Sequence, residues 1–289
     1  VNRAPIKPRG QRSKRKHRNS DFECASVSIA GIRACNEDRC LSGQIHLFGA
    51  PQVAFSFVAD GMGGYCGGEI AATLATDAVV RDFMEHLIAH ALQVQPLAAE
   101  DGLRHAFIRA NAAVNEHAQT NEGCADMGTT LCGALAFGNR LYVASIGDSR
   151  AYLYRGGELT QLTRDDSVLQ QLVDAGKITA EEAGHHPLDN VITRSIGAGE
   201  TLDSLDIRTD EFNPGDIVLS CSDGLWKFAG DHITNLLAKL QSNGPTNDSV
   251  LETARALTQC ALDHGGDDNI SAAVLCCVSN GKTKARTPR

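Results

Sequence analysis

The order of strand-like and helix-like segments limits the fold of this chain more narrowly than any other feature. Short segments rich in valine and phenylalanine open the main body, and two amphipathic helical segments follow. Strand patterns then return, and two more helical segments precede one final strand-like segment. A doubly wound fold alternates single strands with single helices, so this order excludes it. This grouping of strand-like and helix-like segments predicts a mixed α+β architecture with helices and strands in separate layers.

Short turns join several of the strand-like segments, which predicts antiparallel sheets. The segments lie at 22–29, 53–59, 130–137, 140–146, 150–154, 217–220 and 270–278. Gly138-Asn139 is a two-residue hairpin signal, and Gly156-Gly157 predicts a turn after 150–154. The helical segments are expected at 68–90, 100–118, 233–240 and 250–261. Ser249 with Glu252 predicts a capping box at the start of the last helix.

Charge divides the 289-residue chain into three parts. Residues 1–20 contain eight Lys or Arg and no acid, and residues 281–289 contain four and no acid. The net charge of −8 therefore hides a balance of −20 over residues 21–280. We expect disordered basic tails at 1–20 and 281–289, and one domain at 21–280 with a flap at about 165–200. An acidic domain disfavours nucleic acid as a partner and suits cations.

Cysteine content and hydropathy predict the compartment. The chain has ten cysteines but no Cys-x-x-Cys pair, which favours free, structural thiols over zinc sites or disulfides. Cys276 and Cys277 are adjacent in a strand-like segment, so their side chains should face opposite sides of a sheet. No stretch approaches the about 18 to 20 apolar residues of a membrane helix, and no apolar segment follows the basic start. We therefore expect a cytoplasmic protein.

Four aspartates stand at strand ends beside glycine or asparagine. They are Asp60, Asp148, Asp223 and Asp268. Each alone is typical of an ordinary turn, but together, in an acidic domain, they predict a site for hard divalent cations such as Mg²⁺ or Mn²⁺. Glycines beside Asp60 permit a backbone carbonyl to act as a further ligand. Arg33, close to the acids of Asn36-Glu37-Asp38, could bind a phosphate.

Six short motifs in order resemble those of the metal-dependent protein phosphatases, the type 2C serine/threonine phosphatases, in their bacterial single-domain form. They are Arg33-x-x-Asn36-Glu37-Asp38, Asp60-Gly61-Met62-Gly63-Gly64, Met127-Gly128-Thr129-Thr130, Gly147-Asp148-Ser149-Arg150, Ser222-Asp223-Gly224-Leu225 and Asp268-Asn269-Ile270-Ser271. The resemblance covers roughly residues 22–278, and six ordered motifs are far more specific than one. It implies a four-layer αββα sandwich, with two antiparallel sheets flanked by helix pairs.

The same resemblance assigns metal ligands. Asp60 is expected to bridge two Mn²⁺ or Mg²⁺ ions, with the carbonyl of Gly61 on one ion. Asp223 and Asp268 are expected on the other ion, and Glu37 on the first, directly or through water. The family's activity is hydrolysis of phosphoserine and phosphothreonine in proteins, so phosphoproteins and a cognate serine/threonine kinase are the implied partners, and a monomer is expected.

The resemblance also implies roles around these ligands. Asp38 is expected to support the ligands without binding an ion, and Asp148 is expected to hold a third, weaker ion together with Asp223. Arg33 is expected to bind the substrate phosphate while a hydroxide shared by the two ions attacks phosphorus in line. The residues alone also permit a second interpretation of Asp148, in which its carboxylate merely satisfies a turn by pairing with Arg150 or backbone amides.

Two positions depart from the family pattern. Met62 stands where eukaryotic members have a histidine thought to protonate the leaving oxygen, so the general acid is unassigned. Asp166 stands where the family usually has histidine. His185 and His186 are interpreted as a solvated pair in the flap. Two alternatives compete with the phosphatase hypothesis: a non-catalytic phosphoprotein-binding pseudophosphatase, which the complete acid set argues against, and a two-metal nuclease, which the acidic domain disfavours.

Overall fold

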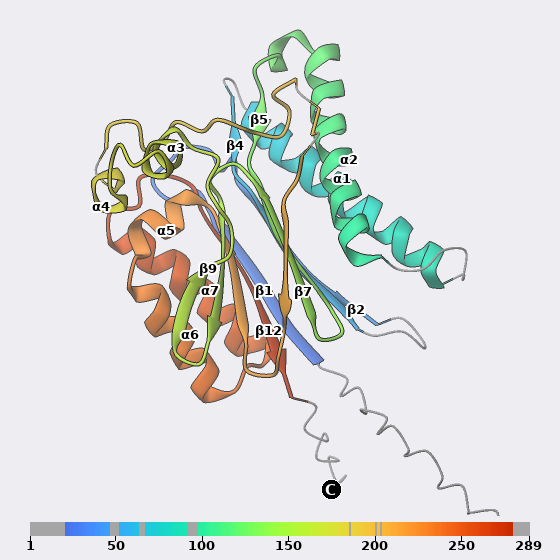
Figure 1. Ribbon diagram of the computed structural model, residues 1–289, viewed down its shortest axis with the longest axis vertical. Helices are drawn as coiled ribbons and strands as arrows, with labels where there is room; N and C mark the ends of the chain where they lie inside the picture. The colour runs from blue at the N-terminus through green and yellow to red at the C-terminus, as the bar shows by residue number, and fades with distance from the viewer. Residues whose placement is uncertain are drawn as a thin grey trace, which may run out of the picture.

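The computed structural model describes residues 21–46, 52–63, 67–91, 98–184, 186–199, 201–202 and 204–279. Both basic tails and His185 lie outside these residues. Two five-stranded antiparallel sheets lie face to face with helices on both outer sides, which confirms the predicted α+β sandwich (Figure 1). Within the described ranges, no helix is both long and apolar enough to cross a membrane.

Each sheet combines strands from distant parts of the chain. The first sheet has the order β1 (Asp21–Ile29), β12 (Ile270–Val278), β11 (Ile217–Cys221), β8 (Arg150–Arg155) and β9 (Glu158–Gln161). The second has the order β10 (Ile207–Glu211), β7 (Arg140–Ile146), β6 (Leu131–Phe137), β3 (Val53–Ala59) and β2 (Arg39–Ile45). A small ribbon pairs β4 (Gly61–Met62) with β5 (Gly128–Thr129).

Helices cover the outer face of each sheet and bury it. The second sheet packs against α1 (Gly67–Ala91) and α2 (Ala99–Thr120), and a short 3₁₀ helix follows at Glu122–Cys124. The first sheet packs against α5 (Asp223–Ala229), α6 (His232–Asn243) and α7 (Asn247–Asp263). Two short helices, α3 (Val168–Asp174) and α4 (Ala180–Ala183), lie in the segment expected to be a flap.

The space between the sheets holds a separate apolar core. Phe22 and Phe212 stack there with ring centroids 5.9 Å apart. Cys277 faces this inner core while Cys276 packs against the helices, as the alternation along a strand predicts. Side chains from the inner faces of both sheets thus pack together across the centre, as in other sheet-on-sheet sandwiches.

The structure corrects several details of the predicted elements. The sequence did not predict strands β2, β4, β5, β9 and β10, helices α4 and α5, or the 3₁₀ helix. All seven residues of β2 are half-buried, so the strand lacks the alternation that marks strands in a sequence. The predicted capping box was placed one turn late: Thr246 caps α7, and Ser249 is the third helical residue that completes the box. The Gly138-Asn139 hairpin is confirmed, since Phe137 pairs with Arg140.

Candidate active site

The antiparallel register brings all the predicted acidic residues to one end of the two sheets. Asp38 precedes β2, and Asp60 follows β3, whose last residue pairs with the first residue of β2. Asp148 lies between β7 and β8, Asp223 follows β11, and Asp268 precedes β12. The end of β11 pairs with the starts of both β8 and β12, so these loops meet at the same edge. Residues separated by up to 230 positions thus gather because their strands alternate in direction.

Asp60 stands at the centre of this group. Its backbone is fixed by Thr130, whose hydroxyl accepts from Asp60 N at 2.9 Å and whose N–H donates to Asp60 O at 2.8 Å. Burial of the carboxyl and the charges of Asp38, Asp223 and Asp148 hold the pKa of Asp60 well above its usual value. The electrostatic field at Asp60 therefore strongly favours a positive partner.

Asp38 is buried beneath this centre, with 1% of its surface exposed. Its Oδ2 accepts hydrogen bonds from Ser222 Oγ at 2.8 Å and Ser271 Oγ at 2.7 Å. Burial, opposed by these two hydrogen bonds, raises the pKa of Asp38 to about 7. The two serines hold Oδ2 of the Asp38 carboxylate. The other oxygen, Oδ1, is buried and has no hydrogen-bond partner among the described residues.

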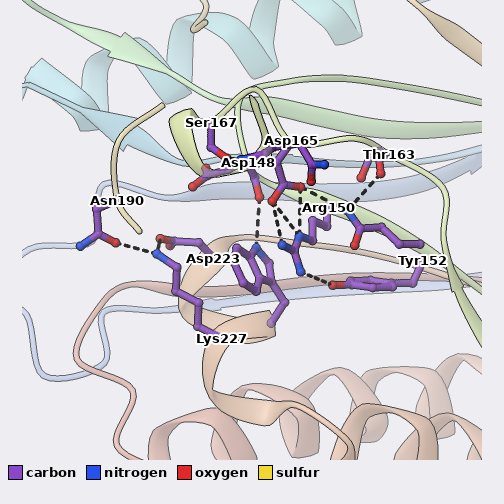
Figure 2. A network of polar contacts seen from close by, with 12 residues as sticks. Asp148, Arg150, Tyr152, Thr163, Asp165, Ser167, Asn190, Asp223 and Lys227 are labelled. Atoms are coloured by element: carbon purple, nitrogen blue, oxygen red, sulfur yellow. Dashed lines mark hydrogen bonds and ion pairs between the residues drawn. The ribbon is translucent and has the colours of Figure 1, made fainter. Parts of the chain in front are cut away.

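Asp223 and Asp148 form the side of the centre that faces the flap segment (Figure 2). Burial and the charge of Asp223 raise the pKa of Asp148 to about 7, against the opposing effect of Lys227. Arg150 does not pair with Asp148, because it donates three hydrogen bonds of 2.7–3.1 Å to Asp165 instead. The arginine partner proposed in the turn interpretation of Asp148 is therefore engaged elsewhere.

Lys227 links the acidic centre to the flap segment, and the sequence did not identify it. Its Nζ donates to Asp223 Oδ2 at 2.6 Å and to Asn190 Oδ1 at 2.6 Å (Figure 2). Lys227 lies one helical turn after Asp223 on α5, a spacing that pairs such side chains. Recognising the pair required α5 itself, which the sequence pattern did not predict. A groove of about 400 Å³ between α3, α4 and α5 reaches Asp148 and Lys227.

The outer rim of the site carries the predicted phosphate-binding arginine. Arg33 is 55% exposed; its Nε donates to Asp267 O at 2.7 Å and its Nη2 to Asp268 Oδ2 at 3.0 Å. Burial and the charge of Asp268 raise the pKa of Glu37, and Arg33 opposes the shift. Asn269 holds this loop, since its side chain binds the backbone of Glu37, Ala30 and Cys35.

Gly61 allows two loops of the site to touch. A Cβ atom at this position would lie 2.1 Å from the carbonyl oxygen of Gly68 and 2.6 Å from that of Glu37. Neither contact is with a flexible side chain, so no larger residue fits without displacing backbone. The start of α1 therefore packs directly on the backbone beside Asp60, with Gly68 against the Gly61 carbonyl.

The two positions that depart from the family pattern lie beside the centre. Met62 lines the groove of about 480 Å³ that runs between α2 and residues 195–199. Asp166 accepts from Gly147 N at 3.2 Å and lies 3.6 Å from Arg194, so it connects the strand end before Asp148 to the flap segment. His186, the described member of the flap histidines, accepts from Leu188 N at 3.2 Å. This hydrogen bond lies within a turn of the flap segment.

The residues of the centre fit divalent cations. The buried oxygens Asp38 Oδ1 and Asp223 Oδ1 have no hydrogen-bond partner within the described part of the chain. The basic side chains that pair with the described acids of the site are Lys227 and Arg33, each with one carboxylate. A buried carboxylate without a hydrogen-bond donor or a positive charge beside it is strongly unfavourable. Mg²⁺ and Mn²⁺ prefer sites of this kind, which are rich in carboxylate oxygens.

Without cations, the folded chain is expected to lose stability as pH rises. Because Asp38 and Asp148 have pKa values near 7 in place of the usual 3.8, the folded chain binds more protons than the unfolded chain between these values. The free energy of unfolding should therefore fall as pH rises from about 4 to about 7. Melting of the chelated chain at pH 5 and pH 8 tests this, at about 2–4 °C per kcal/mol for a domain of this size.

A matched pair of variants separates this effect from other titrations. Asn in Asp38→Asn still accepts from Ser222 and Ser271, so the difference in melting temperature between pH 5 and pH 8 should shrink. Asp248→Asn, at an exposed position in the first turn of α7, should leave it unchanged. The same pH dependence in the chain and in Asp38→Asn would show that Asp38 is not responsible.

Residues 33–269 match the protein phosphatase 2C family. The chain belongs to the protein phosphatase 2C family of serine/threonine phosphatases. Protein phosphatase PhpP of Streptococcus pneumoniae is 34% identical over 255 residues, which cover 88% of this chain and 97% of PhpP. The family and the fold that the sequence motifs implied are thus confirmed.

A mycobacterial relative adds a structural comparison. Serine/threonine protein phosphatase PstP of Mycobacterium tuberculosis is 38% identical over 244 residues, 84% of this chain, and the chain spans 42% of the length of PstP. The crystal structure of the PstP catalytic domain in complex with two manganese ions superposes with a TM-score of 0.70 at 36% identity, covering 89% of this chain and 99% of that one. Stp1 of Staphylococcus aureus gives a TM-score of 0.72 at 29% identity, covering 95% and 100%.

Proposed function

We propose that this chain hydrolyses phosphoserine and phosphothreonine in proteins, using two Mn²⁺ or Mg²⁺ ions and a third, weaker one. The observation that carries the proposal is the set of converging carboxylates in a chain of the phosphatase 2C family. Two of them, Asp38 and Asp223, each have a buried oxygen without a hydrogen-bond partner among the described residues. The two manganese ions of the PstP catalytic domain support the choice of metal. By reversing phosphorylation, the chain would act opposite a serine/threonine kinase.

The proposed ligands come from five separate segments at the ends of strands. Asp60 would bridge the ion pair, with the carbonyl of Gly61 and Glu37 on one side and Asp223 and Asp268 on the other. Asp148 would share the third ion with Asp223. When bound, such ions lower the pKa of a shared water and stabilise negative charge on phosphoryl oxygens. Asp38 supports the centre from below, where Ser222 and Ser271 fix its orientation.

Arg33 is the proposed phosphate-binding residue. Its Nε is anchored on the carbonyl of Asp267, while its Nη2 pairs with Asp268. If Asp268 binds a cation, Nη2 becomes available while the Nε anchor remains. The planar guanidinium then presents its free N–H groups at the rim of the site, where a phosphate can accept two parallel hydrogen bonds.

We further propose that residues 21–280 form one catalytic unit in which residues 165–200 act as a flap over the site. Two contacts support a coupling between flap and centre: Asn190 with Lys227, and Asp166 with Gly147. A monomer in the cytoplasm is proposed as well. Support comes from the nine described cysteines, all of them free thiols, and from exposed large apolar side chains spread over the Ile32 loop, the α1–α2 hairpin and the flap.

The proposed function is tested by phosphate release from a phosphothreonine peptide. Activity should disappear in excess chelator and return with Mn²⁺ or Mg²⁺, while Ca²⁺, which prefers larger and looser coordination, should substitute poorly. Duplex DNA added to the same assay should remain intact. Full hydrolysis in excess chelator would contradict the metal role, and peptide binding without hydrolysis in Mn²⁺ would identify a pseudophosphatase.

A further inference from the structure

Three side chains capable of binding a metal ion meet on the helical hairpin, away from the acidic centre. Asp82 and His86 lie one turn apart on α1, and His105 reaches them from α2, which runs beside α1 (Figure 1). One nitrogen of each imidazole and one oxygen of the carboxylate lie within 4.8 Å of one another. Asp82 is 15 positions beyond Gly67, so the cluster lies roughly 22 Å along the helix axis from the end of α1 at the acidic centre.

Asp82 is the buried member of this cluster and is incompletely satisfied. It is 4% exposed, and its Oδ2 has no hydrogen-bond partner among the described residues. His105 Nδ1 lies 2.7 Å from Asp82 Oδ1, whereas His86 Nδ1 lies 3.3 Å from Oδ2, in a geometry that does not make a hydrogen bond. A buried carboxylate oxygen beside the His86 ring therefore lacks a hydrogen-bond partner, at an energetic cost that a cation would remove.

The side chains are oriented as metal-binding histidines commonly are. The ring of His86 is held by a 2.8 Å contact from Nδ1 to the backbone carbonyl of Asp82; in metal sites such a partner on one ring nitrogen leaves the other nitrogen, here Nε2, to bind the ion. The rings of His86 and His105 lie edge to face with centroids 5.2 Å apart. Since Zn²⁺ binds at about 2.0–2.2 Å from nitrogen and oxygen ligands, an ion would require only small movements of these side chains.

The surroundings of Asp82 carry two acidic and two basic side chains, so Asp82 itself leaves the groove with one net negative charge. The groove beside Asp82 is lined by Glu85 and Glu116 as well as by Arg81 and Arg109. Two imidazoles with one carboxylate favour a transition metal over Mg²⁺ or Ca²⁺, which prefer oxygen ligands throughout. Three protein ligands with a water in the fourth position form a tetrahedral zinc site of a common kind.

We propose that Asp82, His86 and His105 bind one Zn²⁺ ion that connects α1 to α2. This ion is separate from the cations of the acidic centre and takes no part in hydrolysis. Because its ligands come from two helices, it would hold the outer part of α1 against α2. Binding to the folded chain alone raises the stability of that chain by mass action.

The experiment is a calorimetric Zn²⁺ titration of the whole chain in saturating Mg²⁺, which occupies the oxygen-rich centre. The chain should bind one more Zn²⁺ than His105→Gln, and Zn²⁺ should raise the melting temperature of the chain but not of the variant. His105 is about half exposed, so the substitution should leave the fold intact. Loss of one ligand should weaken this site at least about tenfold.

A second ligand variant and a control variant on α2 show whether the additional Zn²⁺ ion depends on the proposed ligands. His86→Gln should behave like His105→Gln, while His117→Gln, three turns further along α2, should retain the additional ion. Hydrolysis of an aryl phosphate in Mg²⁺ should be equal in all four proteins, so a failed phosphatase assay bears only on the proposed function. Equal Zn²⁺ stoichiometry and equal melting shifts in the chain and in His105→Gln would overturn the site.

Discussion

Asp60→Asn is expected to lower turnover on a phosphothreonine peptide by more than about 100-fold. Asp60 is proposed to contact both ions, so one substitution disturbs both ions and the water that they activate. The backbone of Asp60 is held by Thr130 through main-chain atoms that the substitution retains. The fold should therefore persist, and removal of one negative charge should relieve repulsion from Asp38, Asp148 and Asp223.

Steady-state phosphate release over a range of Mn²⁺ concentrations measures this effect. Asp248→Asn, which removes one exposed carboxylate from α7, serves as the matched control and should keep full activity. A melting temperature at or above that of the unsubstituted chain without metal would show that lost activity is not lost folding. Near-normal turnover of Asp60→Asn in saturating Mn²⁺ would place the bridging ligand at another residue.

Asp148→Ala is expected to separate substrates by their leaving groups. Turnover on a phosphothreonine peptide, whose alkoxide must receive a proton, should fall by roughly the 10²–10⁴-fold expected for lost general-acid assistance. An aryl phosphate with a good leaving group needs little protonation, so its turnover should fall much less. We thus assign Asp148 to the leaving-group side of the centre, a role left open because Met62 stands where eukaryotic members of the family have a histidine.

Both substrates measured on the same variant decide between the two interpretations of Asp148. Asp189→Ala removes an exposed carboxylate that lines the same groove, and it should change neither rate by much. Equal losses on the two substrates would remove the leaving-group role. Unchanged rates with a lower melting temperature would show that Asp148 only stabilises its turn, although Arg150 is committed to Asp165.

Lys227 shows how a site residue can escape a motif. The sequence places a lysine four positions after Asp223, but this spacing has meaning only on a helix, and α5 begins at Asp223 itself directly after β11. Its second partner, Asn190, lies 37 positions away in the flap segment. No periodicity links the two, because the contact depends on how the flap lies against α5.

The sequence alone determined the elements whose side chains repeat with a period. The stripe of Ile233, Leu237 and Leu240 on α6 and the hairpin at Gly138-Asn139 are local, because helix faces and tight turns depend on neighbours in the chain. The acidic residues were also identified locally, because each stands beside a glycine or asparagine at a strand end. Strands β2 and β10 were missed because half-buried edge strands lack a clear alternation.

Tertiary structure alone decided the electrostatics. Asp38 looks like any acid beside a turn, yet Ser222 and Ser271, 184 and 233 positions away, enclose it and leave one oxygen without a partner. Asp82 and His105 belong to different helices and meet only because the hairpin closes. Burial and the distance between charges set a pKa and a cation's affinity, and both depend on which distant strands and helices become neighbours.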